Sequence, residues 1–211
     1  MKPPGTFSGI RWCKDKKMEH YQRYISEGYT EEQAFYLAEI KTTQQILSDL
    51  GDNGIYTPTL LLNSLLSMIV LPYEKAKVQN YKFLSEDKIA VFEKSLGITP
   101  TLFQPISKCD GNAPSYNTKT VKSFINKLRN GIAHQNIKVT ISGDRDFEIT
   151  IKNKFTCKNC KGCTSVKCKD KGVKRENGGV IDFEVTVSVN QLKKLAYYIA
   201  NAYLRAIQRG E

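Results

Sequence analysis

The sequence contains only two histidines, His20 and His134, among its 211 residues. It has no zinc-finger pattern of paired cysteines with paired histidines, and no helix-turn-helix is recognisable. These absences argue against a zinc-finger-like DNA-binding protein. Histidine exchanges a proton readily near neutral pH, so acid–base chemistry of that kind has only these two side chains to use.

Long hydrophobic runs are also missing. The longest apolar run covers 12 residues, 60–71, and is interrupted by Asn63, Ser64 and Ser67. A membrane helix needs about 20 apolar residues, so this run predicts a buried core helix. Residues 1–17 lack the apolar segment of a signal peptide. We therefore expect a cytoplasmic protein that makes no contact with a membrane.

Acidic residues are scarce in one segment of a chain whose net charge is +11. Residues 152–175 include nine Lys or Arg and a single acid, Asp170. Such a segment can be a solvated loop, but clustered cations also bind the phosphates of nucleic acids. We favour the second interpretation. The predicted phosphate-binding residues are Lys127, Lys158, Lys161, Lys167, Lys169, Lys171, Lys174 and Arg175.

Four of the six cysteines lie within 12 residues: Cys157, Cys160, Cys163 and Cys168. In a cytosolic protein this density favours a metal over disulfides, and Cys-x-x-Cys spacing is typical of structural zinc. Iron–sulfur ligation and an unliganded hairpin loop remain alternatives. The cluster contains no histidine or carboxylate for an open catalytic site. We therefore expect structural zinc and no cofactor for catalysis.

Hydrophobic periodicity predicts a mainly helical chain with one small sheet. Residues 99–115 include three prolines and predict a connecting loop, and Pro72 is expected to end or bend the apolar helix. Strands with alternating apolar residues should form an antiparallel sheet at 139–141, 147–151 and 181–189. Helices are expected at 14–27, 30–50, 57–71, 74–81, 88–96, 118–134 and 190–207.

These elements predict a loose tail at residues 1–13 and a single domain at residues 14–211. Within that domain, residues 137–189 form an insertion that carries the three-stranded sheet and the cysteine-rich basic loop. The insertion lies between the helix predicted for 118–134 and the last helix. The fold class expected is therefore a helical bundle with an inserted antiparallel sheet.

The helix predicted for residues 118–134 ends in the polar residues Arg129, Asn130 and His134. At about 100° per residue, these three lie away from a continuous apolar stripe, so packing does not require them. Arg and His at a helix end can also simply complement the helix dipole. Gly131 weakens the helix by about 1 kcal/mol relative to alanine, which suggests that it has a use. The stripe consists of Val121, Phe124, Ile125, Leu128 and Ile132.

No carboxylate cluster accompanies this motif, which distinguishes it from a metal-dependent nuclease site. His134 can take or give a proton near neutral pH, and the Arg129 guanidinium can stabilise charge on a pentacoordinate phosphorus. These groups suit metal-independent cleavage of RNA. In that reaction the ribose 2′-OH attacks its own 3′-phosphate and leaves a 2′,3′-cyclic phosphate and a 5′-OH.

The sequence Arg129-Asn130-x-x-x-His134 resembles the Arg-polar-x-x-x-His signature of the HEPN superfamily, the helical RNases of toxin–antitoxin, CRISPR and anti-phage systems. The resemblance covers residues 30–207, with residue-level matching at 127–137. It implies a HEPN-like bundle and a homodimer in which both copies of the motif form one catalytic site. Asn130 would orient His134 or the phosphate. The sheet and the cysteine insert depart from a minimal bundle.

The resemblance further implies RNA, single-stranded or tRNA, as the substrate, and an antitoxin or a sensor protein as a partner. The phosphate-binding residues named above are then predicted to bind RNA. The function we predict is a metal-independent endoribonuclease that acts in phage defence or as a toxin. The alternative is a non-catalytic RNA-binding or interaction module that uses the HEPN dimer as a scaffold.

Overall fold

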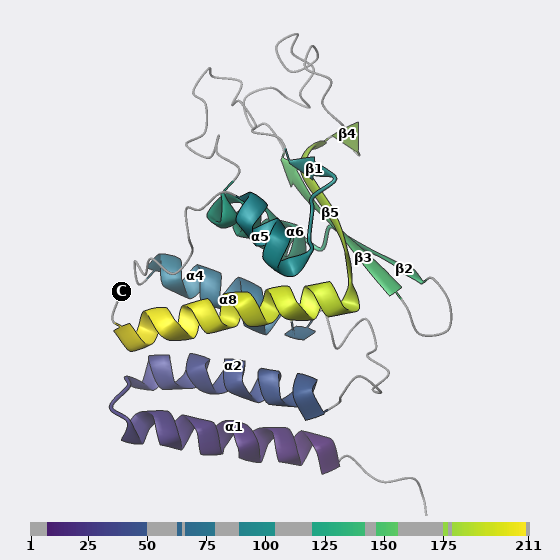
Figure 1. Ribbon diagram of the computed structural model, residues 1–211. Helices are drawn as coiled ribbons and strands as arrows, with labels where there is room; N and C mark the ends of the chain where they lie inside the picture. Colours follow the sequence, from purple (N-terminus) through teal and green to yellow (C-terminus); the bar gives the residue numbers. More distant parts are fainter. Residues whose placement is uncertain are drawn as a thin grey trace, which may run out of the picture. The chain divides into compact units, whose positions relative to one another are not determined.

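The computed structural model describes residues 8–49, 63–64, 66–78, 89–103, 120–141, 147–155, 175–176 and 179–209 (Figure 1). The chain forms two compact units. We call residues 1–83 with 197–211 the helical unit, and residues 84–196 the sheet unit. In the part of the chain that is described, no helix is long and apolar enough to cross a membrane.

The helical unit begins with α1 (Ser8–Ser26) and α2 (Glu31–Asp49), which lie side by side. Helix α1 starts within the stretch predicted to be a loose tail, because the residues that disfavour a helix, Pro3, Pro4 and Gly5, all precede Ser8. Thr30 caps α2 at the start of the helix predicted for residues 30–50: Gln33 N donates to Thr30 Oγ1 at 3.3 Å, and Thr30 N donates to Gln33 Oε1 at 3.1 Å.

The predicted apolar helix is described from residue 63, and its earlier part lies outside the described residues. It contains a π-helical turn, η1 (Leu66–Val70), in which Met68 and Ile69 are fully buried. Helix α4 (Leu71–Val78) follows at once, so Pro72 stands in its first turn, where a helix does not need the missing N–H. The proline therefore coincides with a change of helix type rather than with the end of the helix.

The last helix, α8 (Val189–Arg209), contributes its residues from Tyr197 onward to the helical unit. Tyr197 Oη donates to the carbonyl of Gln44 in α2 at 2.8 Å, and Gln44 Nε2 donates to Asn201 Oδ1 at 3.1 Å. These bonds fix α8 against α2. Apolar side chains of both helices are buried as well: Leu37, Ile40, Leu47, Tyr203, Leu204 and Ile207.

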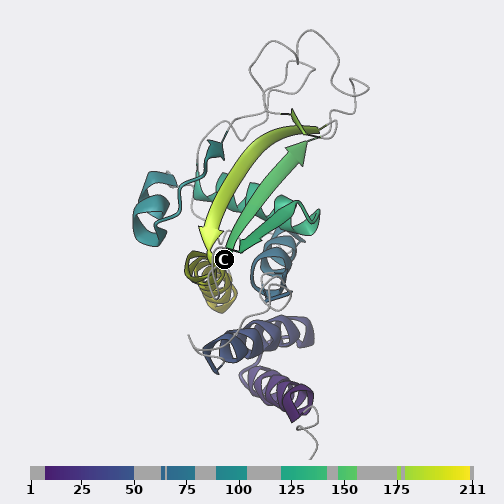
Figure 2. The ribbon, with the colours of Figure 1, turned by 90° about the vertical axis from the view of Figure 1, so that its right-hand side faces the viewer.

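The sheet unit contains one antiparallel sheet with the strand order β1-β5-β3-β2, in which β4 also pairs with β5 (Figure 2). The three predicted strands are present, and two short strands join them. The strands are β1 (Leu102–Phe103), β2 (Ile137–Ile141), β3 (Phe147–Phe155), β4 (Arg175–Glu176) and β5 (Gly179–Ser188).

Strand β1 corrects the prediction of a connecting loop at residues 99–115, of which 104–115 lie outside the described residues. Two residues are too few to show a period, and β1 forms because Phe103 pairs with Phe183 of β5. Their rings meet edge to face with centroids 5.8 Å apart. The sheet is therefore not wholly an insertion, because one strand precedes the motif helix in the chain.

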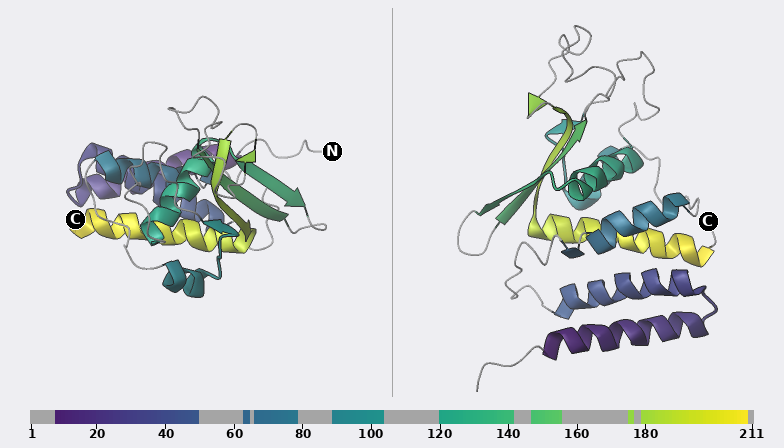
Figure 3. Two further views of the ribbon diagram at one scale, coloured as in Figure 1. Left: turned by 90° about the horizontal axis from the view of Figure 1, so that it is seen from above. Right: turned by 180° about the vertical axis from the view of Figure 1, so that it is seen from behind.

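The sheet unit also contains α5 (Ile89–Leu96), α6 (Val121–Ala133) and the first residues of α8. Helix α6 lies across one face of the sheet and contacts β3 (Figures 2 and 3). That face is formed by side chains that are almost completely buried: Ile149, Ile151, Phe183, Val185 and Val187. The Phe124 ring of α6 packs edge to face on Phe183, with centroids 5.2 Å apart. The sheet thus supports the helix that carries the motif.

Candidate functional site

Helix α6 begins at a buried capping box formed by Thr120 and Ser123. Ser123 N donates to Thr120 Oγ1 at 3.2 Å, and Thr120 N donates to Ser123 Oγ at 3.0 Å. Two backbone N–H groups that a helix leaves without partners are satisfied in this way. The helix therefore starts at a defined residue, and this fixes which side chains of later turns face the sheet.

The helical projection of the motif agrees with the structure. The five residues of the apolar stripe are each at most 3% exposed. Arg129 and Asn130 are half-buried, and His134 is exposed. The three polar side chains therefore emerge beside the buried stripe and not within it. The packing of α6 thus leaves these three side chains at least partly exposed.

Gly131 is buried where α6 touches β3. A Cβ at this position would lie 2.7 Å from Ile151 Cγ2 and 2.7 Å from the carbonyl oxygen of Lys152. Only a residue without a side chain permits this approach of the helix to the strand backbone. The use that the sequence suggested for this glycine is therefore close packing at the centre of the motif.

The end of α6 is fixed by backbone hydrogen bonds. His134 N donates to Asn130 O at 3.0 Å, Gln135 N to Ile132 O at 3.0 Å, and Asn136 N to Gly131 O at 2.9 Å. The last two bonds form a Schellman motif, with Gln135 in the left-handed conformation at φ 55°. The carbonyl of Asn136 then accepts a hydrogen bond from Lys152 N of β3 at 3.0 Å. His134 is thus the C-cap of a helix whose end is attached to the sheet.

The side chain of Arg129 is held from within its own helix. Its Nη2 donates to Asn126 Oδ1 at 3.4 Å, a long hydrogen bond, and its Nε atom is buried. One terminal nitrogen of the guanidinium is therefore engaged within the helix, and the residue as a whole is half-exposed. Asn126 is not part of the sequence motif, although its spacing of three residues from Arg129 places both on one side of a helix.

Lys127 has a different role from the one predicted. It is 8% exposed, and its ammonium donates to Asp182 Oδ2 of β5 in a buried ion pair. Asn153 Nδ2 of β3 donates to the other oxygen of Asp182 at 2.7 Å. The prediction that Lys127 binds RNA is therefore wrong. A buried cation must be paired, and this one joins α6 to two strands.

A β-bulge in β5 brings Asp182 to the helix. Asn153 pairs with Phe183, whereas Lys154 pairs with Ile181, so Asp182 has no partner across the ladder. The sequence predicted unbroken alternation here, in which Asp182 would face away from Phe183. The bulge instead leaves Ile181, Asp182 and Phe183 all buried. Bulges redirect side chains in this way, and here the result is a carboxylate under the motif helix.

The sequence model of the family described as HEPN pEK499 p136 matches residues 18–209. The chain belongs to this HEPN family. No curated protein and no solved structure matches the chain. The match includes residues of both units and all of α6, so it confirms the resemblance that the motif suggested. Membership indicates a nuclease or an RNA-interacting module.

Most of the remaining predicted site residues of this HEPN protein lie outside the described residues. These are the basic residues Lys158, Lys161, Lys167, Lys169, Lys171 and Lys174, and the cysteines Cys157, Cys160, Cys163 and Cys168. Arg175 begins β4. Within the described ranges, no group of three or more His, Cys, Asp or Glu side chains could hold a metal. Zinc binding and RNA binding by this segment stay predictions.

The second histidine of the HEPN protein lies in the other unit. His20 is half-buried in α1, with its Nε2 atom 3.4 Å from Gln45 Oε1 of α2. This contact connects two helices of the helical unit. His134 is the single histidine in residues 84–196. The motif of one chain therefore contains one imidazole, one guanidinium and one amide, those of His134, Arg129 and Asn130.

Proposed function

We propose that the protein is a metal-independent endoribonuclease whose catalytic residues are Arg129, Asn130 and His134. The observation that carries the proposal is the placement of these residues on α6. The helix buries its apolar stripe, is held by the sheet at Gly131, and leaves His134 exposed at its fixed end. A rigid platform with an exposed proton-transfer group suits catalysis that depends on positioning.

The reaction we assign is transfer of a phosphoester within the RNA. The 2′-oxygen attacks the adjacent phosphorus while its proton passes to a base, and the bond from phosphorus to the 5′-oxygen breaks as that oxygen receives a proton. His134 moves these protons. Arg129 stabilises the extra negative charge on the pentacoordinate phosphorus, and Asn130 orients His134 or the phosphate. The products are a 2′,3′-cyclic phosphate and a 5′-OH.

A homodimer would complete the site. The reaction needs one group that removes a proton and one that supplies a proton, and the sheet unit has a single histidine. Two copies of α6 supply two His134 and two Arg129. We therefore propose a composite site shared by two protomers. Phage defence or toxicity, with an antitoxin or sensor as the controlling partner, is the setting that we infer from HEPN membership.

Cleavage of single-stranded RNA and tRNA in EDTA tests the chemistry. We expect products with a 2′,3′-cyclic phosphate, and we expect Arg129→Ala and His134→Ala each to abolish them. Arg205→Ala, at an exposed position of α8, and His20→Ala are the matched controls and should retain cleavage. Cleavage that persists in both motif variants would refute the site. RNA binding without product in the wild-type protein would instead support a non-catalytic module.

Mixed dimers test the composite site. Wild-type protein and the His134→Ala variant can be co-expressed in equal amounts, so that they pair at random. If both protomers must supply His134, about a quarter of the dimers are active, whereas independent sites would leave about half of the activity. Measurement of the cleavage rate per protomer separates these outcomes. A rate near half of the wild-type value would remove the dimer requirement.

The four clustered cysteines are proposed to bind one structural zinc ion through thiolates. Zinc bound there would order the basic segment, and the neighbouring lysines would offset the charge of four thiolates. Elemental analysis of the purified protein should give about one zinc per chain, and Cys157→Ser with Cys160→Ser should lose it. Equal zinc content in both proteins would refute this site without affecting the assignment of Arg129 and His134.

A further inference from the structure

Gln135 has a backbone conformation that this protein otherwise gives to glycine. Its φ is 55°, and the other residues with positive φ in the described ranges are Gly28 at 89° and Gly97 at 64°. All three stand just after a helix: Gly28 after α1, Gly97 after α5 and Gln135 after the His134 C-cap of α6. A side chain makes the left-handed conformation less favourable, so glycine is the usual residue there.

The hydrogen bonds at this position do not need a glutamine. Helix α1 ends with the same two bonds as α6, because Gly28 N donates to Ile25 O at 3.0 Å and Tyr29 N donates to Tyr24 O at 3.1 Å. In α1 and α6 alike, both bonds join backbone atoms only. Glycine at position 135 would therefore form the same cap with less strain. The glutamine side chain must be explained by something other than the helix end.

The side chain of Gln135 is exposed, and its amide makes no hydrogen bond to any residue that the structure describes. It directly follows His134, and consecutive Cα atoms lie about 3.8 Å apart. The Gln135 side chain is thus close enough to His134 to reach the base of a nucleotide whose phosphate lies there. An amide offers one acceptor and two donors, and in nucleic-acid recognition Gln pairs with the N6 and N7 atoms of adenine.

We propose that Gln135 determines base specificity, and that it recognises an adenine next to the cleaved phosphate through two hydrogen bonds. This rests on the proposed function, since the adenine is placed by cleavage at His134. Single-stranded RNA exposes its base edges to such contacts. The strained backbone at Gln135 is then retained because it presents the amide beside the catalytic histidine. A glycine would stabilise the cap but lose the recognition.

The test exchanges the residues at two helix ends. Gln135→Gly removes the amide, and Gly28→Gln places the same side chain at the equivalent position of α1, where a Cβ would meet nothing within 4 Å. We expect Gln135→Gly to raise the melting temperature and Gly28→Gln to lower it. Only Gln135→Gly should change base preference. A residue with a purely structural role would not combine a gain in stability with a loss of discrimination.

The readout is the Kd of short RNAs that differ only at the base beside the target phosphate and carry a 2′-O-methyl group that blocks cleavage. The wild-type protein and Gly28→Gln should bind the adenine RNA roughly 5- to 150-fold more tightly than the other three. Gln135→Gly should reduce this ratio to about 2-fold or less. Preference for another base in the wild-type protein, or full discrimination in Gln135→Gly, would overturn the assignment.

Binding to the blocked RNAs does not depend on catalysis, so the two proposals fail separately. If His134→Ala still cleaves RNA, the catalytic assignment fails whatever the base preference. If cleavage requires His134 but discrimination survives in Gln135→Gly, the proposed role of Gln135 fails alone. Cleavable RNAs provide a second measurement, in which kcat/KM for the four bases should become nearly equal in Gln135→Gly.

Discussion

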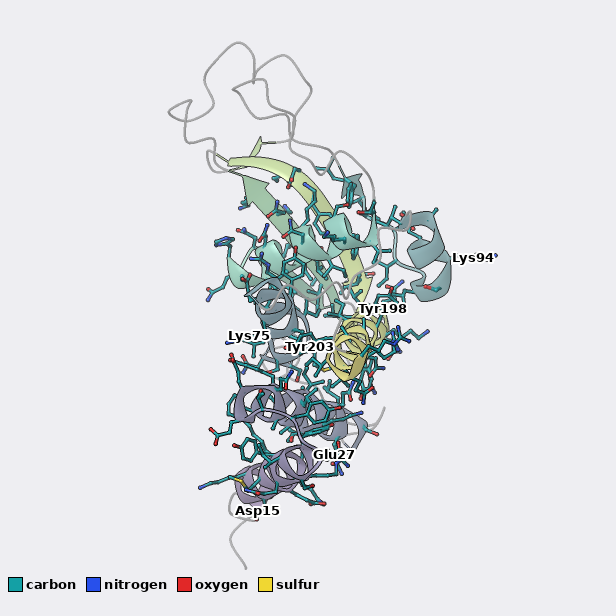
Figure 4. All side chains as sticks on the ribbon, turned by 90° about the vertical axis from the view of Figure 1, so that its left-hand side faces the viewer. Asp15, Glu27, Lys75, Lys94, Tyr198 and Tyr203 are labelled. Atoms are coloured by element: carbon teal, nitrogen blue, oxygen red, sulfur yellow. The ribbon has the colours of Figure 1, made fainter. Side chains whose placement is uncertain are left out.

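The helical unit and the sheet unit both use a lysine to join elements, but in opposite environments. In the helical unit, Lys75 of α4, which Figure 4 labels, donates to Glu32 of α2 at 2.8 Å. Its ammonium lies 4.6 Å from the centre of the Tyr36 ring. These groups are partly exposed to water. In the sheet unit, Lys127 donates to Asp182 with both side chains buried. One partner of the surface pair can be removed with little loss of stability, whereas removal of one partner of the buried pair is strongly destabilising.

A second surface lysine also pairs with a glutamate of α2 and lies over an aromatic ring of that helix. Lys17 of α1 pairs with Glu39 and lies 4.1 Å from the centre of the Phe35 ring. Water and salt screen such contacts, so the loss of one can be tolerated. A buried pair differs, because the removal of one partner leaves the other charged and without solvent. The helix that carries the motif is therefore held by the kind of ion pair whose disruption costs more stability.

The largest effect is expected from Lys127→Met, which leaves Asp182 buried without its cation. We expect the free energy of unfolding to fall by about 3–5 kcal/mol, measured by urea unfolding followed by circular dichroism. Lys127→Met with Asp182→Leu removes both charges and should be more stable than Lys127→Met alone. Equal stability of the single and double variants would show that the pair is not coupled.

The next effect is expected from Gly131→Ala. Alanine favours a helix by about 1 kcal/mol, but its Cβ would lie 2.7 Å from the Lys152 carbonyl, which belongs to a paired strand and cannot easily move. Overpacking of this kind costs about 1–3 kcal/mol, so we expect a net loss of stability. The cleavage rate should fall too, because α6 must shift away from β3. A variant more stable than the wild-type protein would contradict this account of the glycine.

A smaller loss of stability is expected when the threonine cap of a helix is removed, and it should differ between two helices that both begin with threonine. Thr120 and Thr30 both begin a helix with a capping box, but Thr120 is buried and Thr30 is exposed. Removal of a threonine cap costs about 0.5–2 kcal/mol. Thr120→Ala should approach the upper value because a buried N–H loses its partner, whereas water can replace the hydroxyl in Thr30→Ala. Equal losses of stability in the two variants would show that burial does not change the contribution of the threonine cap.

The smallest effect is expected from Lys75→Gln. The hydrogen bond to Glu32, and then the contact with Tyr36, raise the pKa of Lys75 above its ordinary value. A raised lysine pKa stabilises the fold at neutral pH and ceases to do so only as pH rises through that pKa. Because the pair is solvated, the melting temperature at pH 7 should fall by less than about 2 °C. A loss of stability as large as that of Lys127→Met, with both variants measured by urea unfolding, would show that exposure does not determine how much these ion pairs stabilise the fold.

Much of the fold follows from local patterns. Alternation of apolar residues predicted β2, β3 and β5, and hydrophobic periodicity predicted helices that match α2 and α5. The apolar stripe of α6 correctly separated buried residues from the motif. These features depend on neighbours within a few positions along the chain, which is the range over which residue patterns are informative.

The parts that could not be predicted depend on distant contacts. Lys127 and Asp182 are far apart in the sequence, and charge alone does not show whether a lysine is buried, so the sequence predicts that Lys127 binds phosphate. The bulge at Asp182 is hidden because the apolar residues around it still alternate. Gly131 could be recognised as unusual, but the reason for it lies in the backbone of β3.

One backbone amide can report on the order of the motif. The N–H of Lys152 in β3 donates to the carbonyl of Asn136, two residues after His134. Its proton can exchange for deuterium only when the end of α6 separates from the strand. The exchange rate of this one amide thus measures how often the end of α6 separates from β3. A residue outside the motif would in this way reveal whether bound RNA makes the motif more rigid.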